Sequence, residues 1–443
     1  MNGRRTGADA GVHLWYGQRG IQVVLPDWCR IHTIRKRRAA PLQDPEGEVR
    51  RALRCPVEMA PLREIARGRR DACILICDVT RPVPNGILLP PVVEELEAAG
   101  IPRERMTILI ATGLHRPAPE QEKRLLVGDD RVYRSVRVEN HRAEDDGAHV
   151  FLGTTSRGTP VRLDRRFVDA QVRVVTGLIE PHFMAGYSGG RKVVAPGVAH
   201  RDTILAIHSP EFMEHPRATS CVLDGNPLHQ DQLEILGMVG EAFAVNAVVD
   251  EDRRPVFLSA GDVERSHGLA VAEARRISEV PVGRRFHTIL TSAGGFPLDK
   301  TYYQTVKGMV TPLDILEPGG TVIVVSECSE GIGSNAFVAA QDVLRERGAE
   351  GFLRWIRRPG ARTAVDQWQT EKLAQALCRG RVELYAPGLS RGDWGRVCVE
   401  RCADPAASVA RSVARRADRH VAVIPEGPYV IPTVGDAGDR PGA

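Results

Sequence analysis

The chain has 443 residues, which are too many for a single hydrophobic core, so we expect two or three domains. Hydrophobic residues make up 42% and charged residues 26% of the sequence, as is ordinary for a soluble globular protein. With 60 basic and 56 acidic residues the formal net charge is only +4, which gives no reason to expect nucleic acid or a membrane surface as a partner.

Cysteine usage and the distribution of apolar residues predict a cytoplasmic protein. The nine cysteines are scattered and no two pairs have zinc-finger spacing, so we expect buried thiols in a reducing compartment. The first fifteen residues are not followed by an apolar stretch, unlike a secretory signal. No run of about 18 apolar residues occurs, so no membrane-spanning helix is expected.

Short apolar runs alternate with helical patterns along the chain. Helices are predicted at 91–100, which ends in a glycine, and at 302–316. Strands are predicted, in chain order, at 72–77 (ACILIC), 106–112 (MTILIAT), 171–180 (QVRVVTGLIE), 286–294 (FHTILTSAG), 319–327 (GGTVIVVSE) and 420–427 (HVAVIPEG). The order strand, polar turn, helix, strand is typical of a parallel α/β sheet.

The fold class predicted from this pattern is α/β, with two domains and mostly parallel sheets. A charged helix ends and a new strand begins close to Val280, which we take as the domain boundary. The N-terminal domain would span residues 11–280 and the C-terminal domain residues 281–420. Residues 421–443 would form a tail able to pack back on the N-terminal domain, and residues 1–10 a loose tail.

Polar residues gather just after three of the predicted strands. Asp78 and Arg81 follow the first strand, His115 follows the second, and Glu180 and His182 follow the third. Ligands of open α/β sheets bind outside the carboxyl ends of the strands. We therefore expect these side chains to face one crevice.

The turn GYSGGRKV at 186–193 has two interpretations. Glycines before a lysine allow backbone N–H groups to approach a phosphate, but the spacing fits neither the P-loop nor the G-x-G-x-x-G pattern. The alternative is a surface turn with a solvated lysine. The neighbouring Pro181, His182, Tyr187 and His208 favour a functional site.

Two histidines at two strand ends suit general acid/base chemistry. His115 and His182 could serve opposite faces of one substrate, although a lone histidine at such a position is more often structural. Arg81 could clamp a carboxylate or phosphate, and the alternative is a weak surface ion pair with Asp78. His141 and His200 are expected at the surface or behind the site.

A further polar group lies on the helix predicted after residue 301. Gln304 and Lys307 share one helix face and follow Tyr303, although a solvated face is a strong alternative. Trp368 could belong to the core.

Taken together, these segments resemble the nickel-dependent lactate racemases, which use a nickel-pincer nucleotide. The resemblance runs from about residue 72 to Trp368, and its segments keep the order and approximate spacing of the family. They are DVTRPVP, IATGLHRP, EPHFMAGYSGGRKVVAPG, the region of His208, YQTVK and DQWQ.

The resemblance implies a role for each of these positions. Lys192 would carry the cofactor, a pyridinium dithio mononucleotide, through a thioamide, and His208 would be the nickel ligand. His115 and His182 would be the acid/base pair, while Arg81 and Lys307 would bind the substrate carboxylate. The remaining residues implied to contact the cofactor or to line its pocket are Asp78, Tyr187, Gly189, Gly190, Tyr303, Gln304 and Trp368.

The implied function is racemisation or epimerisation of a 2-hydroxy acid, lactate or a larger analogue, by reversible hydride transfer. The cofactor and active site would lie between the two domains, and proteins of cofactor biosynthesis would be partners. Two alternatives stay open: a different nucleotide- or metal-dependent α/β enzyme, and a non-catalytic cofactor-binding homologue.

Overall fold

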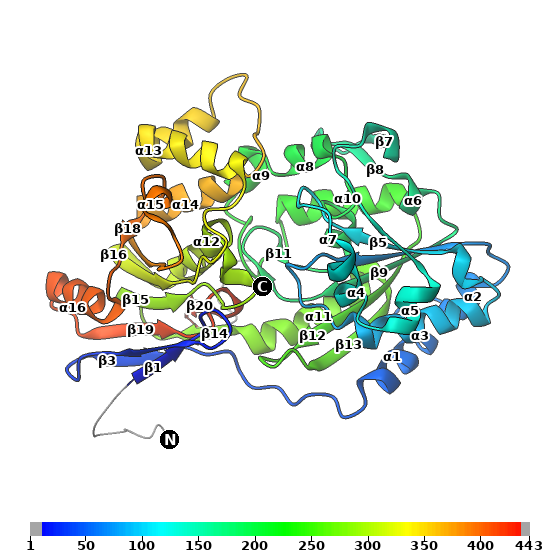
Figure 1. The fold of residues 1–443 in the computed structure, drawn as a ribbon, viewed down its shortest axis with the longest axis horizontal. Helices are drawn as coiled ribbons and strands as arrows, with labels where there is room; N and C mark the ends of the chain where they lie inside the picture. The colour runs from blue at the N-terminus through cyan, green and yellow to red at the C-terminus, as the bar shows by residue number, and fades with distance from the viewer. Residues whose placement is uncertain (1–10, 436–443) are drawn as a thin grey trace. The chain divides into compact units, whose positions relative to one another are not determined.

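The computed structural model describes residues 11–435, which form two compact units (Figure 1). The first, called here the inserted unit, is Arg38–Ile277. The second, called the split unit, combines residues 11–37 with residues 278–435. No helix in this part of the chain is long and apolar enough to cross a membrane.

The inserted unit is built on a six-stranded sheet of order β13-β12-β9-β4-β5-β6. Its strands are β4 (Ala72–Cys77), β5 (Met106–Ala111), β6 (Arg137–Asn140), β9 (Val172–Leu178), β12 (Phe243–Val249) and β13 (Pro255–Asp262). Neighbouring strands are parallel except β12 and β13, which are antiparallel. Strand β4 is almost wholly buried, as its unbroken apolar sequence predicts for a parallel strand covered on both faces.

Helices and two small hairpins surround this sheet. Side chains of α1 and α3 share one core with β4, β5 and β12. The helices are α1 (Pro45–Arg54), α2 (Leu62–Ala66), α3 (Asn85–Ala98), α4 (Glu120–Val127), α5 (Asp130–Ser135), α6 (Arg165–Val168), α7 (Arg191–Val194), α8 (Arg201–Ile207), α9 (Pro210–Met213), α10 (Pro227–Val239) and α11 (Val263–Ser278). The hairpins are β7 (His149–Thr154) with β8 (Pro160–Asp164), and β10 (Pro181–His182) with β11 (Gly186–Tyr187).

The split unit contains a second six-stranded sheet, of order β18-β17-β16-β15-β19-β3, in which all neighbours are parallel. Its strands are β3 (Arg30–Thr33), β15 (Phe286–Ser292), β16 (Leu316–Val325), β17 (Arg381–Tyr385), β18 (Glu400–Arg401) and β19 (His420–Ile424). Two further pairs are β1 (Gly11–Leu14) with β2 (Ile21–Val24), and β14 (Glu279–Val282) with β20 (Ile431–Val434). Its helices are α12 (Tyr302–Val310), α13 (Asn335–Ile356), α14 (Gln367–Arg379), α15 (Arg391–Trp394) and α16 (Pro405–Arg416).

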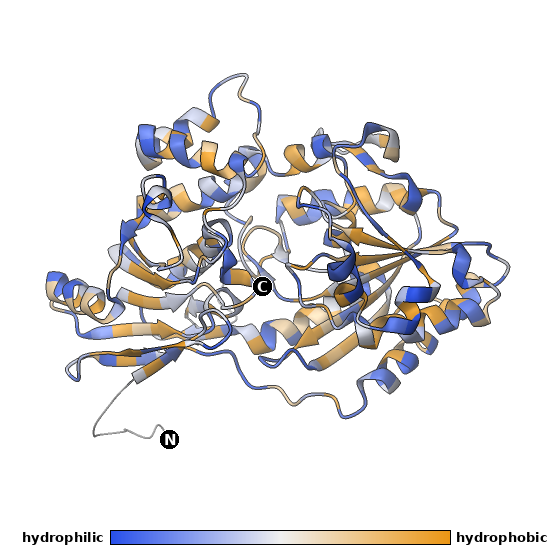
Figure 2. Ribbon diagram, viewed as in Figure 1, coloured by the Kyte–Doolittle hydropathy of each residue, from blue (hydrophilic) through white to orange (hydrophobic). Residues whose placement is uncertain are grey.

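Both faces of this second sheet are covered by apolar side chains. Ile289, Val322 and Val324 join a core with residues of α12, α13 and α14. Their sequence neighbours Leu290 and Ile323 join a second core with α16 and the β1–β2 hairpin. Successive strand residues point to opposite faces, which explains why adjacent positions belong to different cores. Figure 2 shows orange, hydrophobic segments along the strands of this sheet.

The predicted fold class is confirmed, because each unit has a mostly parallel sheet with helices. The predicted domain boundaries need correction at both ends of the chain. Residues 11–37 belong to the split unit and not to the N-terminal domain, since β3 pairs with β19. Strands β19 and β20 are likewise part of the split unit and not a tail on the other one. The predicted tails at 1–10 and 436–443 lie outside the described residues.

Candidate active site

Three adjacent strands of the inserted unit deliver polar side chains to one edge of its sheet. Strands β9, β4 and β5 are parallel neighbours, so their carboxyl ends meet. Asp78 follows β4 directly, Glu180 comes two residues after β9, and His115 closes the turn after β5. The shared edge predicted from the sequence is therefore the arrangement seen.

Asp78 and His115 form a hydrogen-bonded pair at this edge. The Oδ2 atom of Asp78 lies 2.6 Å from Nδ1 of His115. The Thr80 hydroxyl donates to the other carboxylate oxygen at 2.6 Å. Burial would raise the pKa of Asp78, but the charge and hydrogen bond of His115 and the bonds from Thr80 outweigh it, so this pKa lies below its usual range. With Nδ1 of His115 donating to a carboxylate, Nε2 keeps its lone pair and is positioned as a base.

Arg81 is paired with Glu180, which the sequence placed at the same sheet edge without indicating a role for it. Its Nη1 atom donates to Oε1 of Glu180, and the two side chains are only 17% and 14% exposed. The only sequence signal for Glu180 was its place at the end of β9, directly before Pro181.

The glycine-rich turn packs closely against the end of strand β9. Gly189 and Gly190 both have positive φ, +73° and +52°. A Cβ atom at Gly177 would lie 2.9 Å from the Cα of Gly189, so neither backbone leaves room for a side chain there. The turn leads straight into α7, which carries Lys192.

Arg191 anchors the same turn from inside the unit. Its side chain is 1% exposed, and its Nη2 donates to the carbonyl oxygen of Ala185 at 2.8 Å. Its Nη1 lies 2.8 Å from Nε2 of His267. Arg191 therefore holds the turn in place from inside the unit. The residues next to it in the sequence did not indicate this role.

Lys192 is half-buried at the start of α7. Burial, together with the positive charges of Arg81 and Arg191, lowers the pKa of its amine from 10.5 to about 7. About half of such amines are neutral at neutral pH, and a neutral amine is nucleophilic. This lysine is therefore not the solvated surface group of the alternative interpretation.

His208 ends helix α8 in a buried place within electrostatic reach of Lys192. Burial lowers the pKa of His208 to about 4, so the ring is neutral at physiological pH. Its Nδ1 atom lies 2.8 Å from the carbonyl oxygen of Ile204. A carbonyl only accepts, so Nδ1 carries the proton and Nε2 has the lone pair that a metal ion requires.

His182 is held differently from His115. The backbone N–H groups of Met184 and Ala185 lie 3.3 and 3.2 Å from its Nδ1 and donate to it. The neutral ring therefore carries its proton on Nε2, which can donate it. Nε2 can accept a proton only after it has lost this one and Nδ1 has been protonated, which requires the ring to leave these amides. Tyr187, in the paired strand β11, is 0% exposed.

The split unit brings together the predicted site residues of α12 and α14. Nε1 of Trp368 donates to the hydroxyl oxygen of Tyr303 at 3.2 Å, and Gln369 donates to the Tyr303 carbonyl at 2.7 Å. Gln304 and Lys307 lie on the same helix as Tyr303. Trp368 is 6% exposed, so it is both a core residue and a partner of Tyr303.

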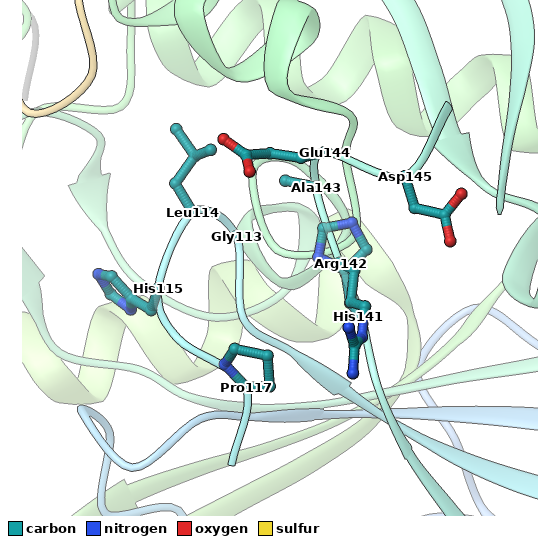
Figure 3. A pocket seen from close by; sticks show the side chains of 9 residues that line it. All are labelled: Gly113, Leu114, His115, Pro117, His141, Arg142, Ala143, Glu144 and Asp145. Carbon is teal, nitrogen blue, oxygen red and sulfur yellow. The ribbon is translucent and has the colours of Figure 1, made fainter. Parts of the chain in front are cut away.

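A hollow of about 420 Å³ lies beside His115 in the inserted unit (Figure 3). It is lined by residues that follow strands β5 and β6, namely Gly113, Leu114, His115, Pro117, His141, Arg142, Ala143, Glu144 and Asp145. Figure 3 shows His115 and Asp145 at opposite ends of this hollow. A ligand held at His115 could extend into it.

The chain matches two family models, the lactate racemase N-terminal domain over residues 16–221 and the lactate racemase C-terminal domain over residues 284–432. It is 31% identical over 444 residues to the lactate racemase of Thermoanaerobacterium thermosaccharolyticum, with 95% of this chain and 99% of that protein covered. The chain belongs to the lactate racemase family. As a member of that family it is an isomerase of the racemase type.

Further relatives agree with membership of the lactate racemase family. The lactate racemase of Lactiplantibacillus plantarum is 35% identical over 338 residues, which cover 75% of this chain and 78% of that protein. The apoprotein structure of the Thermoanaerobacterium thermosaccharolyticum enzyme has a TM-score of 0.86 at 30% identity, covering 96% of this chain and all of that one. A crystal structure of a Thermotoga maritima protein, with a TM-score of 0.68 at 17% identity, covers 90% of this chain and all of that one, and it shares the fold alone.

Proposed function

We propose that this lactate racemase family member interconverts the enantiomers or epimers of a 2-hydroxy acid, lactate or a larger analogue, using a nickel-pincer nucleotide tethered to Lys192. The observation that carries the proposal is the amine of Lys192, with its pKa lowered to about 7, in a turn that follows the sheet edge where Asp78 pairs with His115. Gly189 and Gly190 of the same turn let its backbone pack against the end of β9 and against His267, which positions Lys192.

The residues present fit such a cofactor. An amine of lowered pKa can form the thioamide link, because its neutral form attacks an activated thiocarbonyl carbon, expels the activating group from that carbon and loses a proton. The buried neutral ring of His208, protonated on Nδ1, offers Nε2 to nickel. When bound, the cofactor would supply a hydride acceptor, which avoids forming a carbanion at the substrate's α-carbon.

The side chains of this chain would move the proton and hold the substrate. His115 would take the hydroxyl proton on Nε2, and the carboxylate of Asp78 would stabilise the resulting imidazolium through the 2.6 Å contact. Arg81 would bind the substrate carboxylate in competition with Glu180. Lys307 would provide a second positive charge, and Tyr303, Gln304 and Trp368 would line the pocket.

His182 would serve the opposite enantiomer as the second acid/base group. Its ring must first leave the backbone amides of Met184 and Ala185, whereas His115 is already oriented as a base. His115→Ala and His182→Ala should each abolish racemisation.

The first experiment is peptide mapping by mass spectrometry of protein co-produced with the cofactor-making proteins and nickel. A mass adduct on the Lys192 peptide, nickel in the protein, and loss of optical rotation with a 2-hydroxy acid are expected. An unmodified Lys192 would refute the proposal if a known lactate racemase is modified in the same cells.

A further inference from the structure

A second group of titratable side chains lies next to the β7–β8 hairpin and plays no part in the proposed racemisation. It consists of His141, His149 and Asp164, which are 0%, 4% and 0% exposed. Each residue has one nitrogen or oxygen atom that could bind a metal ion, and these three atoms all lie within 4.8 Å of one another. The two imidazole rings meet edge to face, and their Nε2 atoms are 3.0 Å apart. Of the two expectations for His141, burial excludes a surface group and is compatible with a group behind the active site.

Neighbouring groups determine where the protons of these rings lie. Nδ1 of His149 is 2.6 Å from the carbonyl oxygen of Asp145, which can only accept, so Nδ1 carries the proton. The Thr112 hydroxyl lies 2.9 Å from the carbonyl oxygen of His141 and 3.2 Å from its Nδ1. With the hydroxyl proton of Thr112 on the shorter contact, Nδ1 of His141 would donate to the Thr112 oxygen. Both Nε2 lone pairs would then be available to one metal ion, which would replace the Nε2–H···Nε2 hydrogen bond that the 3.0 Å contact forms without it.

The carboxylates beside the rings are paired with arginines. Oδ1 of Asp164 accepts hydrogen bonds from the backbone N–H and Nε of Arg166 at 3.0 and 2.9 Å, and its Oδ2 accepts from Nη2 of Arg166 at 2.5 Å. Arg166 and Arg137 both pair with Glu139. A carboxylate oxygen has a second lone pair, which is what Asp164 would offer to a metal ion. His200 stands 5.1 Å from the ring of His149 but directs Nε2 at Asp146, 3.1 Å away, so it is a neighbour and not a ligand.

We propose that His141, His149 and Asp164 bind a divalent transition-metal ion of the Zn²⁺ type at a site separate from Lys192 and His208. Two imidazoles and a carboxylate, with solvent as a further ligand, form a set that zinc, cobalt and nickel accept. The contacts of the two Nδ1 atoms with a backbone carbonyl and a hydroxyl are the outer bonds that orient metal-ligating histidines.

The metal would fasten three separate parts of the inserted unit. His141 directly follows β6, His149 begins β7 and Asp164 ends β8. Residues 141–145 between these points form a wall of the hollow beside His115. The ion therefore acts structurally, by holding that wall in place.

The test uses protein produced without the cofactor-making proteins, treated with a chelator and titrated with Co²⁺. One equivalent should bind and produce the visible absorption of four- or five-coordinate cobalt without a thiolate charge-transfer band, and Zn²⁺ should displace it. The midpoint of thermal unfolding should rise when the ion is bound. A wild-type protein that binds no Co²⁺ overturns the proposal.

Variants locate the ion. His149→Asn should abolish binding, while His215→Asn, at an exposed histidine of the same unit, should retain it. Lys192→Ala and His208→Ala should also retain it, and loss of binding in His208→Ala with retention in His149→Asn would overturn the proposal.

X-ray absorption of the zinc-loaded wild type needs no variant. It should show two imidazole ligands, and sulfur ligands or a lack of imidazoles would overturn the site. Because no cofactor is involved, these outcomes are independent of the racemase proposal.

Discussion

Replacing Lys192 by methionine should stabilise the inserted unit while removing the proposed point of cofactor attachment. The amine has a pKa of about 7 in the folded protein, against 10.5 as the ordinary value. Between these two pH values the unfolded chain binds a proton that the folded chain lacks. Stability therefore rises with pH across this window, and the cost of burying the amine is largest at and below pH 7.

The size of the effect follows from the two pKa values. At about 1.4 kcal/mol per pKa unit, the buried amine costs up to about 4 kcal/mol of unfolding free energy at pH 7 and about 2 kcal/mol at pH 9. These are upper values, because the side chain keeps some contact with solvent. Lys192→Met keeps the length of the side chain without its charge. Its stability gain should accordingly be about 2 kcal/mol smaller at pH 9 than at pH 7.

The assay must report on the inserted unit alone. All five tryptophans, Trp15, Trp28, Trp355, Trp368 and Trp394, lie in the split unit, so their fluorescence follows the wrong part of the chain. Cys73 is 1% exposed in strand β4, and its thiol becomes reactive when the inserted unit unfolds. Pulsed thiol labelling of Cys73 in increasing urea, read by peptide mass, gives the unfolding curve at each pH.

A matched control is Lys123→Met, which removes a lysine paired with Glu120 on helix α4 of the same unit. It should show no comparable gain. The reasoning is refuted if Lys192→Met is no more stable than the wild type, or if its gain is the same at pH 7 and pH 9.

Two further predictions concern the loaded enzyme. Asp78→Asn removes the charge from the 2.6 Å contact with His115 and should lower kcat/KM by about 10- to 100-fold, because a hydrogen bond to a charged group contributes about 1.5–3 kcal/mol. Polarimetry measures kcat/KM. As a control, Asp250→Asn breaks an ion pair elsewhere in the inserted unit and should leave kcat/KM unchanged. An Asp78→Asn enzyme with wild-type kcat/KM would contradict the orienting role of that carboxylate. His208→Ala should lose nickel while the organic adduct on Lys192 remains, as intact mass and metal analysis would show; retention of nickel would assign the metal to another ligand.

The parts of the fold that sequence could predict are those whose signal is local. Strands β4, β5 and β9 are buried on both faces, so their apolar runs are unbroken and identify them. The pairing of β3 with β19 joins segments almost four hundred residues apart, and nothing in either segment indicates its partner. Residues 11–37 were therefore assigned to the wrong domain.

The residues of the candidate site also fall into those that local sequence signals could identify and those that they could not. Asp78, Arg81 and His115 could be selected because they follow strands, and the topology places those strands side by side. Glu180 and Arg191 could not be assigned roles, because these depend on contacts with Arg81 and His267 from distant parts of the chain.

The division of the chain has a consequence for the order of events during synthesis. The inserted unit is continuous, so all of it leaves the ribosome while the last third of the polypeptide is still being made. The split unit must wait, because β3 stays without its neighbour until β19 has been translated. The lysine and histidines proposed to receive the cofactor thus belong to a unit that can form first, when α12 and α14 do not yet exist.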